Sequence, residues 1–400
     1  MTAMVRSPGD LSVELLVVGA GPVGLLAALL AARQGLDVAV VDQTFRGFGR
    51  GYAALLHPSS ARTLEELGLG AKLREVGREI RAVTLHVGDA AELTLSLASP
   101  AFSLKQSALE DLLLAALRQE EVPIHAPCEA STIQQDARAV RVRVVRKELV
   151  TVGSPGDPGE WQPVDSSTIT ADFVIGADGY GSKVRGALGI DVVSVAGTKA
   201  FAMFEVPAAD ASSATVELGF ADGLGSVVVP LPEAQARLGF EITGGLDRDP
   251  DAERLRELVS TRAPWFEERL REMHWSSVVH FERRLARHFG AGRVWLAGDA
   301  AHVTHPFGAQ SMNLGLSEAR ELALRATECL RGGASVSSLG TYDAERRREW
   351  HKLLGVNVRY DLLPHAPAWL PAHAREIGPA LPASGEDLDG LLQQLGVSVG

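Results

Sequence analysis

The sequence has little positive charge and little cysteine. Its 400 residues include 39 Lys and Arg against 50 Asp and Glu, which gives a formal net charge of −11. Such a chain has no positive field with which to gather nucleic-acid phosphates or an anionic membrane surface. The two cysteines, Cys128 and Cys329, lie far apart and outside any CxxC pair, so neither a disulfide framework nor a thiolate zinc site is indicated. We therefore expect a cytoplasmic protein without a nucleic-acid partner.

One uncharged and mostly apolar run, residues 15–32, is long enough to resemble a signal peptide or a membrane helix. Gly19, Gly21, Pro22 and Gly24 interrupt this run. A membrane helix through these residues would lose backbone hydrogen bonds that lipid cannot replace. A strand, a tight turn and a helix use the glycines naturally. We therefore expect no membrane insertion.

Hydrophobic periodicity predicts alternating strands and helices at the start of the chain and mostly strands in its middle. Strands are predicted at residues 13–18, 37–41, 139–145, 168–176, 200–206, 214–220, 225–231, 237–243 and 293–297. Helices are predicted at residues 22–34, 59–67, 107–119, 251–273, 313–330 and 386–395. Ser107 and Glu110 form the capping-box pattern of the third helix. A proline-rich stretch covers residues 364–382.

A glycine motif of the form GxGxxG lies between the first predicted strand and helix. It consists of Gly19, Ala20, Gly21, Pro22, Val23 and Gly24. Glycines at these positions permit a tight turn and let backbone N–H groups approach a pyrophosphate. Asp42 lies 18 residues after Gly24, at the end of the second strand, where a carboxylate accepts hydrogen bonds from adenosine ribose hydroxyls. The alternative is a tight connection without a ligand, but the motif and Asp42 together favour dinucleotide binding.

Two later segments distinguish FAD from NAD, which the glycine motif alone does not. Asp178 and Gly179 follow one predicted strand, and Gly298 and Asp299 follow another. Together with the first motif, they resemble the three signatures of the FAD-dependent aromatic hydroxylases of the p-hydroxybenzoate hydroxylase type, the group A flavoprotein monooxygenases. The resemblance covers about residues 13–330. It implies FAD as cofactor and NADH or NADPH as co-substrate.

The resemblance also implies roles for single residues. Asp299 resembles the carboxylate that hydrogen-bonds the ribityl or ribose part of FAD, and Gly298 allows close approach. Asp178 resembles the residue that serves FAD and nicotinamide binding. Arg50 resembles an arginine near the pyrophosphate, with a solvated surface side chain as the alternative. Gln106 stands where the family has Arg or Gln, with an ordinary helix-start residue as the alternative.

Residues 306–313 resemble the loop that runs under the flavin ring and ends at a helix N-terminus. The residues carried over are Pro306, Gly308, Ser311, Met312 and Asn313. The positive end of the helix dipole and its free N–H groups stabilise negative charge on reduced flavin, and we expect Met312 and Asn313 to donate. The family usually has glycine at the positions of Ala309 and Ser311, so flavin mobility and the oxygen pocket are open questions.

Three histidines and one tyrosine have competing interpretations. His302 and His305 form an HxxH pair, but neither an HExxH helix nor a third ligand accompanies them. We therefore expect a structural role in the loop and no metal. His57 and Tyr52 are weak candidates to face the substrate and relay a phenolic proton, with ordinary packing as the alternative.

These observations predict an α/β fold. A discontinuous Rossmann-like FAD-binding domain is predicted at residues 12–80, 105–190 and 286–340. A mostly antiparallel substrate sheet is expected at residues 81–104 and 191–285, and a C-terminal helical segment at residues 341–400.

The resemblance implies a monooxygenase that uses NAD(P)H and O2 and acts through a C4a-hydroperoxyflavin. The expected reaction is hydroxylation or epoxidation of an aromatic or polycyclic small molecule, in specialised metabolism, with a bulky apolar aromatic as the favoured substrate. The alternatives are a flavin-binding protein without turnover, a flavin-dependent reductase and an NAD-dependent dehydrogenase. A halogenase is disfavoured because the positions of the six Trp residues leave no WxWxIP motif. The choice of NADH or NADPH and the oligomeric state stay open.

Overall fold

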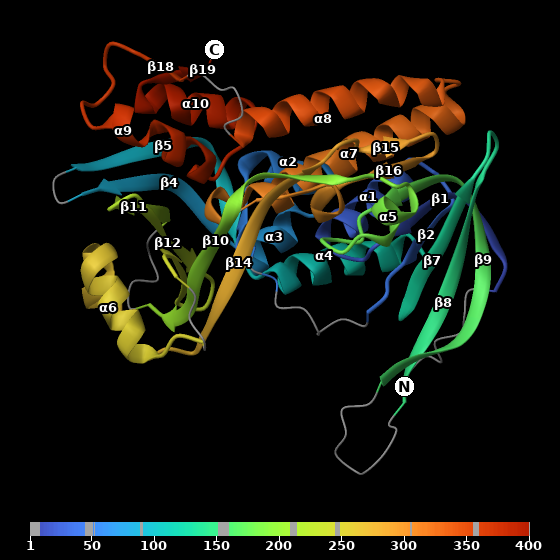
Figure 1. Ribbon diagram of the computed structural model, residues 1–400, viewed down its shortest axis with the longest axis horizontal. Coiled ribbons are helices and arrows are strands. Elements are labelled where there is room, and N and C mark those ends of the chain that lie inside the picture. Colours follow the sequence, from blue (N-terminus) through green and yellow to red (C-terminus); the bar gives the residue numbers. More distant parts are fainter. Residues whose placement is uncertain are drawn as a thin grey trace.

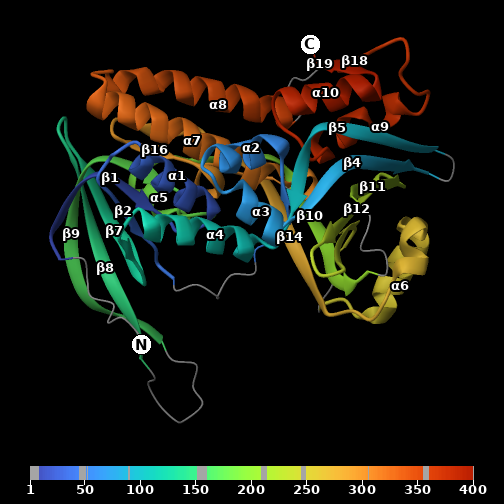
Figure 2. The same ribbon diagram turned by 180° about the vertical axis from the view of Figure 1, so that it is seen from behind.

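The computed structural model describes residues 9–44, 51, 53–88, 91–150, 160–208, 214–244, 249–304, 306–354 and 360–399. Figure 1 shows a sheet that contains β4, β5, β10 and β14 at one end of the molecule and the β8–β9 hairpin at the other. The C-terminal helices α8, α9 and α10 run along one side of both parts, and Figure 2 shows the same order from behind. The α/β fold class is thereby confirmed.

The first sheet has a parallel centre in the order β16-β9-β1-β2-β6. These strands are β1 (Leu11–Val18), β2 (Val38–Val41), β6 (Ile124–His125), β9 (Glu160–Gly176) and β16 (Val294–Leu296). Antiparallel pairs add β7 (Cys128–Gln135), β8 (Val140–Val150) and β15 (Gly290–Ala291). Apart from Leu11, the Val and Leu residues of β1 and β2 are buried because α1 (Pro22–Arg33), α4 (Gln106–Gln119) and α7 (Gln310–Arg331) pack with this sheet in one core.

The carboxyl ends of β1 and β9 form the point where the strand order diverges. From β1 the chain passes through α1 to β2 on one side, whereas β9 pairs on the other side. The loops after β1 and β9 meet closely, since a Cβ on Gly19 would lie 2.2 Å from the carbonyl oxygen of Ala177. Ligands of open α/β sheets bind in the crevice at such a point.

The second sheet has the strand order β17-β14-β10-β13-β12-β11-β4-β5-β3. Its strands are β3 (Leu55–Leu56), β4 (Arg78–Val87), β5 (Ala91–Ser103), β10 (Val192–Pro207), β11 (Thr215–Ala221), β12 (Leu224–Leu231), β13 (Gln235–Ile242), β14 (Trp275–Ala286) and β17 (His302–Val303). The prediction of a mostly antiparallel sheet is confirmed, with β4 and β11 as a parallel pair. Helix α6 (Ala252–Arg262) packs on one face, and the other face turns toward the end of β3 and the loop before α7.

The remaining helices are short and lie around these two sheets. They are α2 (Pro58–Glu66), α3 (Gly70–Val76), α5 (Lys183–Ala187) and the 3-10 helices η1 (Pro264–Arg269), η2 (Gly298–Ala300), η3 (Phe307–Ala309) and η4 (Val336–Ser338). The C-terminal segment contains α8 (Leu339–Leu353), α9 (Leu370–Ala380) and α10 (Glu386–Leu395), and also the pair β18 (Tyr360–Leu362) and β19 (Val397–Val399). This segment is therefore helical with a small added sheet.

Three local expectations need correction. Ser107 is not the N-cap of α4, because the helix begins one residue earlier and Lys105 occupies that position without a side-chain cap. The helix expected over residues 251–273 ends at Arg262, because Ala263 leaves helical geometry before Pro264. Helix α9 forms inside the proline-rich stretch, where Pro371 fits the first turn.

The predicted domain boundaries stay a proposal. Strands β3 and β17 pair in the second sheet although the predicted boundaries assign their residues to the FAD-binding domain. The apolar run at residues 15–32 forms the end of β1, a turn and α1. Across the part of the chain that the structure describes, no helix has the length and apolar character needed to span a membrane.

Candidate functional site

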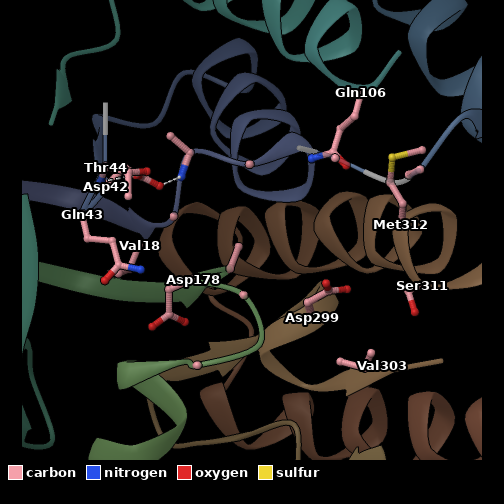
Figure 3. A pocket seen from close by; sticks show the side chains of 18 of the residues that line it. Val18, Asp42, Gln43, Thr44, Gln106, Asp178, Asp299, Val303, Ser311 and Met312 are labelled. Atoms are coloured by element: carbon pink, nitrogen blue, oxygen red, sulfur yellow. Dashed lines mark hydrogen bonds between the residues drawn. The ribbon is translucent and has the colours of Figure 1, made fainter. Parts of the chain in front are cut away.

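A cleft of about 510 Å³ lies at the carboxyl ends of β1 and β9 and extends to the start of α7. Figure 3 shows Asp42, Gln43 and Thr44 at one end, Asp178 in the middle, and Ser311 and Met312 at the other end. Both sheets and the loop before α7 therefore contribute to one elongated site.

Two glycines of the motif are needed for different reasons, Gly24 for packing and Gly21 for open space in the cleft. Gly24 is required for packing, since a Cβ there would lie 2.0 Å from the carbonyl oxygen of Gly19. Gly21 lines the cleft, and a Cβ on it would meet no atom within 4 Å. The open space above Gly21 faces the N-terminus of α1, whose first N–H groups have no helical partner. This cradle fits a pyrophosphate, which is the part of FAD that the motif predicts.

The carboxylate of Asp42 is fixed at the end of β2. Its Oδ2 accepts from the backbone N–H of Ala20 at 2.6 Å, and its Oδ1 accepts from the N–H and hydroxyl of Thr44, each at 2.8 Å. A carboxylate oxygen has more than one lone pair, so both oxygens keep acceptor capacity toward the cleft. Asp42 is therefore a preorganised acceptor at the predicted ribose position.

Asp178 lines the cleft, but its hydrogen bonds serve α5. Its Oδ1 accepts from the hydroxyl of Ser182 at 2.6 Å, and its Oδ2 accepts from the N–H groups of Lys183 and Val184 at 2.7 and 3.1 Å. Burial raises the pKa of this carboxyl, and these hydrogen bonds oppose the shift. The geometry indicates that Asp178 holds the Asp-Gly turn in place at the rim of the cleft.

Asp299 lies farther along the cleft than Asp178, toward Ser311 and Met312 (Figure 3). Its side chain lines the cleft and is exposed there. Burial raises the pKa of Asp299, and the carboxylate of Glu318 raises it further, whereas His302 and Arg284 lower it. A bound polyol that donated a hydrogen bond to the Asp299 carboxylate would favour its ionised form and so offset the cost of ionisation.

A buried network behind Asp299 was not predicted. Glu318 accepts from the backbone N–H of Gly298 at 2.8 Å, from His302 Nε2 at 2.8 Å and from Trp350 Nε1 at 3.0 Å. His302 also stacks on Trp350, with ring centroids 3.8 Å apart. Glu318 is fully buried and therefore needs these donors. This network gives His302 the structural role that was expected for it and fixes the turn that carries Asp299.

The loop before α7 has unusual backbone geometry. Gly308 has φ of 73° and Ala309 has φ of 50°, so both lie in the left-handed region. Helix α7 begins at Gln310, and Ser311 and Met312 line the cleft beside its free N-terminal N–H groups. The hydroxyl of Ser311 accepts from the N–H of Thr304 at 3.0 Å. The serine therefore ties the loop to the strand before it.

The two left-handed residues should respond oppositely to substitution. Ala309→Gly should raise the free energy of unfolding by about 0.5 to 1 kcal/mol, because glycine adopts a positive φ without the steric cost of a Cβ. Gly308→Ala should lower it by about 2 kcal/mol or more, because the new Cβ would lie 2.5 Å from the carbonyl oxygen of Pro379. Urea unfolding of the apoproteins measures both changes. Equal shifts in the two variants would contradict this account of the loop.

His57 does not line the cleft, which argues against the weak prediction of a proton relay. It is fully buried, and its Nε2 lies 2.5 Å from the carbonyl oxygen of Gly308 while its Nδ1 lies 3.2 Å from the hydroxyl of Ser384. Because a carbonyl only accepts, Nε2 carries the proton and the Ser384 hydroxyl donates to Nδ1. Burial lowers the pKa of His57 to about 4. His57 therefore joins the loop to the C-terminal segment as a neutral side chain.

The lowered pKa of His57 predicts a pH dependence of stability. In the unfolded chain His57 becomes protonated below its ordinary pKa of 6.5. In the folded chain it stays neutral until the pH falls to about 4. The contribution of neutral His57 to the free energy of unfolding should therefore be fully present above pH 6.5. The free energy of unfolding should fall by about 3 kcal/mol as the pH drops from 6.5 to 4. His57→Gln lacks this titration, so the stability difference between wild type and variant should shrink over the same interval. Urea unfolding at several pH values checks this, and parallel profiles would refute it.

The structure brings most predicted site residues to the cleft, but several only surround it. The lining includes Gly19, Gly21, Asp42, Gln106, Asp178, Asp299, Pro306, Ser311 and Met312. Outside the lining lie Pro22, Val23, Gly24, Gly298, Gly308 and Asn313. Asn313 was expected to donate through its backbone N–H, which stays a prediction; its side chain is buried and bonds to the backbone of His57, Leu55 and Ala309. Arg50, Tyr52 and His305 fall outside the described residues.

Sequence patterns missed other parts of the cleft wall. The unpredicted lining includes Gln43, Thr44, Cys128, Glu129, Ala130, Lys183, Phe281, Thr304 and Gln310. Only Thr44 had a usable signal, because a hydroxyl two residues after an Asp often closes an Asx-type turn. The described residues contain no cluster of three or more His, Cys, Asp or Glu side chains that could hold a metal ion.

Comparison with known proteins identifies the family. The profile of the FAD binding domain family matches residues 12–355. 6-Methylpretetramide 4-monooxygenase from Streptomyces rimosus is 28% identical over 344 residues, which cover 83% of this chain and 59% of that protein. Pentachlorophenol 4-monooxygenase from Sphingobium chlorophenolicum is 25% identical over 371 residues, which cover 90% of this chain and 67% of that protein. The chain thus spans about three fifths to two thirds of the length of these relatives.

A solved structure shares the fold. The crystal structure of p-nitrophenol 4-monooxygenase from Pseudomonas putida matches with a TM-score of 0.70 at 20% identity, over 96% of this chain and 97% of that one. The resemblance to the group A aromatic hydroxylases is confirmed by these matches. Because the family profile covers most of the chain and the glycine cradle fits a dinucleotide, the protein belongs to the FAD binding domain family, with FAD as its cofactor.

Proposed function

We propose that the protein is an FAD-dependent monooxygenase that uses NAD(P)H and O2 to hydroxylate or epoxidise an aromatic or polycyclic small molecule in specialised metabolism. The relatives described above are named as monooxygenases of 6-methylpretetramide, of pentachlorophenol and of p-nitrophenol. FAD, when bound, supplies electron transfer from the nicotinamide and the reaction with O2. The chain supplies position, charge and the exclusion of water.

The observation that carries this proposal is a second, apolar cavity beside the flavin loop. It has a volume of about 30 Å³ and is bounded by Pro306, Gly308 and Ala309 on one side and by the second sheet on the other. Its apolar walls include Ala54, Leu55, Met203, Val216, Leu218, Val227 and Val229. Such walls exclude water from a reaction at the flavin face. These apolar walls support the proposal that an aromatic ring is held on this side of the loop before α7.

This cavity is too small to hold an aromatic substrate. A volume of about 30 Å³ holds roughly one water molecule, so a bulky aromatic enters only after the walls move. Ala380 and Pro382 of the C-terminal segment close one side. Arg237 lines the cavity and is held by an ion pair with Glu205. We propose that the C-terminal segment moves aside when the substrate enters.

We propose O2 and a nicotinamide as co-substrates, no nucleic-acid partner, no membrane insertion and a cytoplasmic location. The net charge of −11 supports the absence of nucleic acid. The cysteines Cys128 and Cys329 are both free thiols, which supports a reducing compartment.

Anaerobic reduction tests this function. The purified protein, reconstituted with FAD, is mixed with NADH or NADPH with and without a panel of phenols and polycyclic aromatics, and flavin absorbance is followed. We expect at least one compound to accelerate bleaching and, in air, to yield an oxygenated product. Flavin that binds but is never reduced faster by any aromatic would favour the flavin-binding protein without turnover. Absence of flavin after reconstitution would favour the dehydrogenase.

A further inference from the structure

Two cavities lie between the second sheet and α9. One is the apolar cavity of about 30 Å³ beside the flavin loop, and the other is a polar cavity of about 190 Å³. Helix α9 borders both, since Ala380 lines the apolar cavity and Pro379 lines the polar one. The walls of the polar cavity are Lys199, Phe220, Gly223, Gly225, Glu241, Arg283, Phe307, Arg375, Glu376 and Pro379. The polar cavity has no role in the proposed function.

The same four strands supply both cavities. The first residue of each of the following pairs lines the polar cavity and the second lines the apolar one: Lys199 and Met203 on β10, Phe220 and Leu218 on β11, Gly225 and Val227 on β12, and Glu241 and Arg237 on β13. The residues of a pair lie an even number of positions apart, so they point to the same face of the sheet. The two cavities are therefore neighbouring sections of one trough between this face and α9.

The ring of Phe307 lies between the two sections. Phe307 lines the polar cavity, while its neighbours Pro306 and Gly308 line the apolar one. Its side chain is buried and meets the ring of Phe201 edge to face, with 5.0 Å between the ring centroids. Gly225 forms a notch for the ring, since a Cβ there would lie 2.2 Å from Phe307 Cε2.

The two residues that hold this ring stand at the boundary between the sections. On β10, Phe201 lies between Lys199 of the polar cavity and Met203 of the apolar one, on the same face. On β12, Gly225 comes two residues before Val227 of the apolar cavity. A ring that packs on Phe201 and Gly225 therefore divides the trough.

This partition belongs to the sheet side of the trough. Phe201 and Gly225 are both residues of the second sheet, so their contacts with Phe307 do not depend on the C-terminal segment. Movement of α9 widens the apolar section but leaves the ring on the sheet. Displacement of the ring itself would cost the packing of a buried phenylalanine. The length of the trough that a ligand can use is therefore set by Phe307.

We propose that Phe307 is a specificity-determining residue that limits the size of the substrate, so that the enzyme takes single aromatic rings in preference to fused polycycles. This inference rests on the proposed monooxygenase function and names the substrate class of that site. A single ring needs only the section of the trough beside the flavin loop. Further fused rings extend into the space that the Phe307 ring occupies.

The test compares aromatics that carry one hydroxyl group and differ in the number of fused rings. Equilibrium dialysis at pH 7.5 measures the Kd of phenol, 1-naphthol and 9-phenanthrol for the FAD-loaded protein. We expect wild type to bind 9-phenanthrol no more tightly than phenol, although the phenanthrol is far more apolar. Phe307→Ala should bind 9-phenanthrol on the order of tenfold more tightly than wild type does, because the opened trough buries the additional rings. The Kd of phenol should stay within about twofold of the wild-type value.

Two further variants separate the size limit from a general loss of packing. Phe204→Ala is the matched control, because Phe204 lies on the opposite face of β10, is fully buried and packs on Phe240. It loses the same ring from the same strand environment but should not change the preference among the three phenols. Phe307→Leu keeps more of the packing and should give an intermediate gain for 9-phenanthrol. If Phe307→Ala leaves the preference unchanged or does not bind 9-phenanthrol, or if Phe204→Ala shifts the preference equally, the proposal is wrong.

A double-mutant cycle checks that the ring occupies the notch. Gly225→Ala should lower the free energy of unfolding strongly in the wild-type protein, because the new Cβ meets the Phe307 ring. The same substitution should cost little in the Phe307→Ala protein. Urea unfolding of the four proteins measures both effects. Additive losses would show that the ring lies elsewhere and would remove the basis of the size limit.

Dialysis keeps this test separate from the test of the function. A protein whose flavin is reduced faster with aromatics, but whose preference among the phenols does not respond to Phe307→Ala, retains the monooxygenase function and refutes the size limit. A protein in which Phe307→Ala shifts the preference, but in which no aromatic is ever oxygenated, retains the size limit and refutes the monooxygenase function.

Discussion

Gly21→Val should abolish retention of FAD while leaving the protein folded. Gly21 has φ of −73° and ψ of 176°, which valine adopts easily, and a Cβ there meets no protein atom within 4 Å. The valine side chain would instead occupy the space at the N-terminus of α1 where the pyrophosphate belongs. We expect the Kd for FAD to rise on the order of 100-fold or more. Flavin absorbance after reconstitution and desalting measures the loss, and circular dichroism confirms the fold.

Two further variants sharpen this prediction. Gly340→Val places the same side chain at an exposed position of α8 that also has open space, so FAD should be retained. Gly24→Ala should lower stability itself, because its Cβ would lie 2.0 Å from the carbonyl oxygen of Gly19. A Gly21→Val protein with normal flavin content would show that the pyrophosphate lies elsewhere.

Asp299→Ala should weaken FAD binding by about 10- to 100-fold, which is the range for the loss of one charge-assisted hydrogen bond. The same variant should make the apoprotein more stable. The raised pKa of Asp299 means that the folded state holds the proton more firmly than the unfolded chain, so ionisation at neutral pH lowers stability. Removal of the carboxyl removes this penalty. Asp299→Ala should therefore lower the affinity for FAD and raise the melting temperature of the apoprotein.

Asp136→Asn serves as the control for Asp299. Its carboxylate is exposed, and the N–H groups of Arg138 and Ala139 lower its pKa, so its ionised form stabilises the fold. This variant should lose a little stability and keep its FAD. If Asp299→Ala instead lowers the melting temperature of the apoprotein, the carboxylate has a structural role that the geometry does not show.

The strands and the helix that carry the glycine motif and Asp42 were predicted correctly from the local sequence. The strand before Gly19, the helix after Gly21 and the strand before Asp42 all form where expected. Each depends on a run of buried apolar residues and on glycines whose geometry is set within a few residues. The helix after Gly68 and the break at Ala263 depend on weaker local signals and were missed or misplaced.

The failures at single residues have a common cause. His57 and Asn313 carry groups that can serve a ligand, and the sequence cannot show that each finds partners more than 250 residues away along the chain. Glu318 gave no signal for the same reason, since its partners Gly298, His302 and Trp350 come from different elements. A polar side chain acquires its role from the groups that bury it, and those groups are set by tertiary packing.

The sequence by itself determined the dinucleotide-binding unit and the choice of FAD. The steric contact between Gly24 and Gly19 and the acid at Asp42 need little information beyond their own neighbourhoods, and the choice of FAD followed from the family resemblance that Asp178 and Asp299 carry. Only the tertiary structure decided how the second sheet, the flavin loop and the C-terminal segment close around the substrate side. Two adjoining cavities, one apolar and one with Arg283 in its wall, exist because alternate side chains of separate strands meet α9 and Phe307. Contacts between distant segments leave no periodic pattern in a sequence, so the substrate side became visible only in the folded chain.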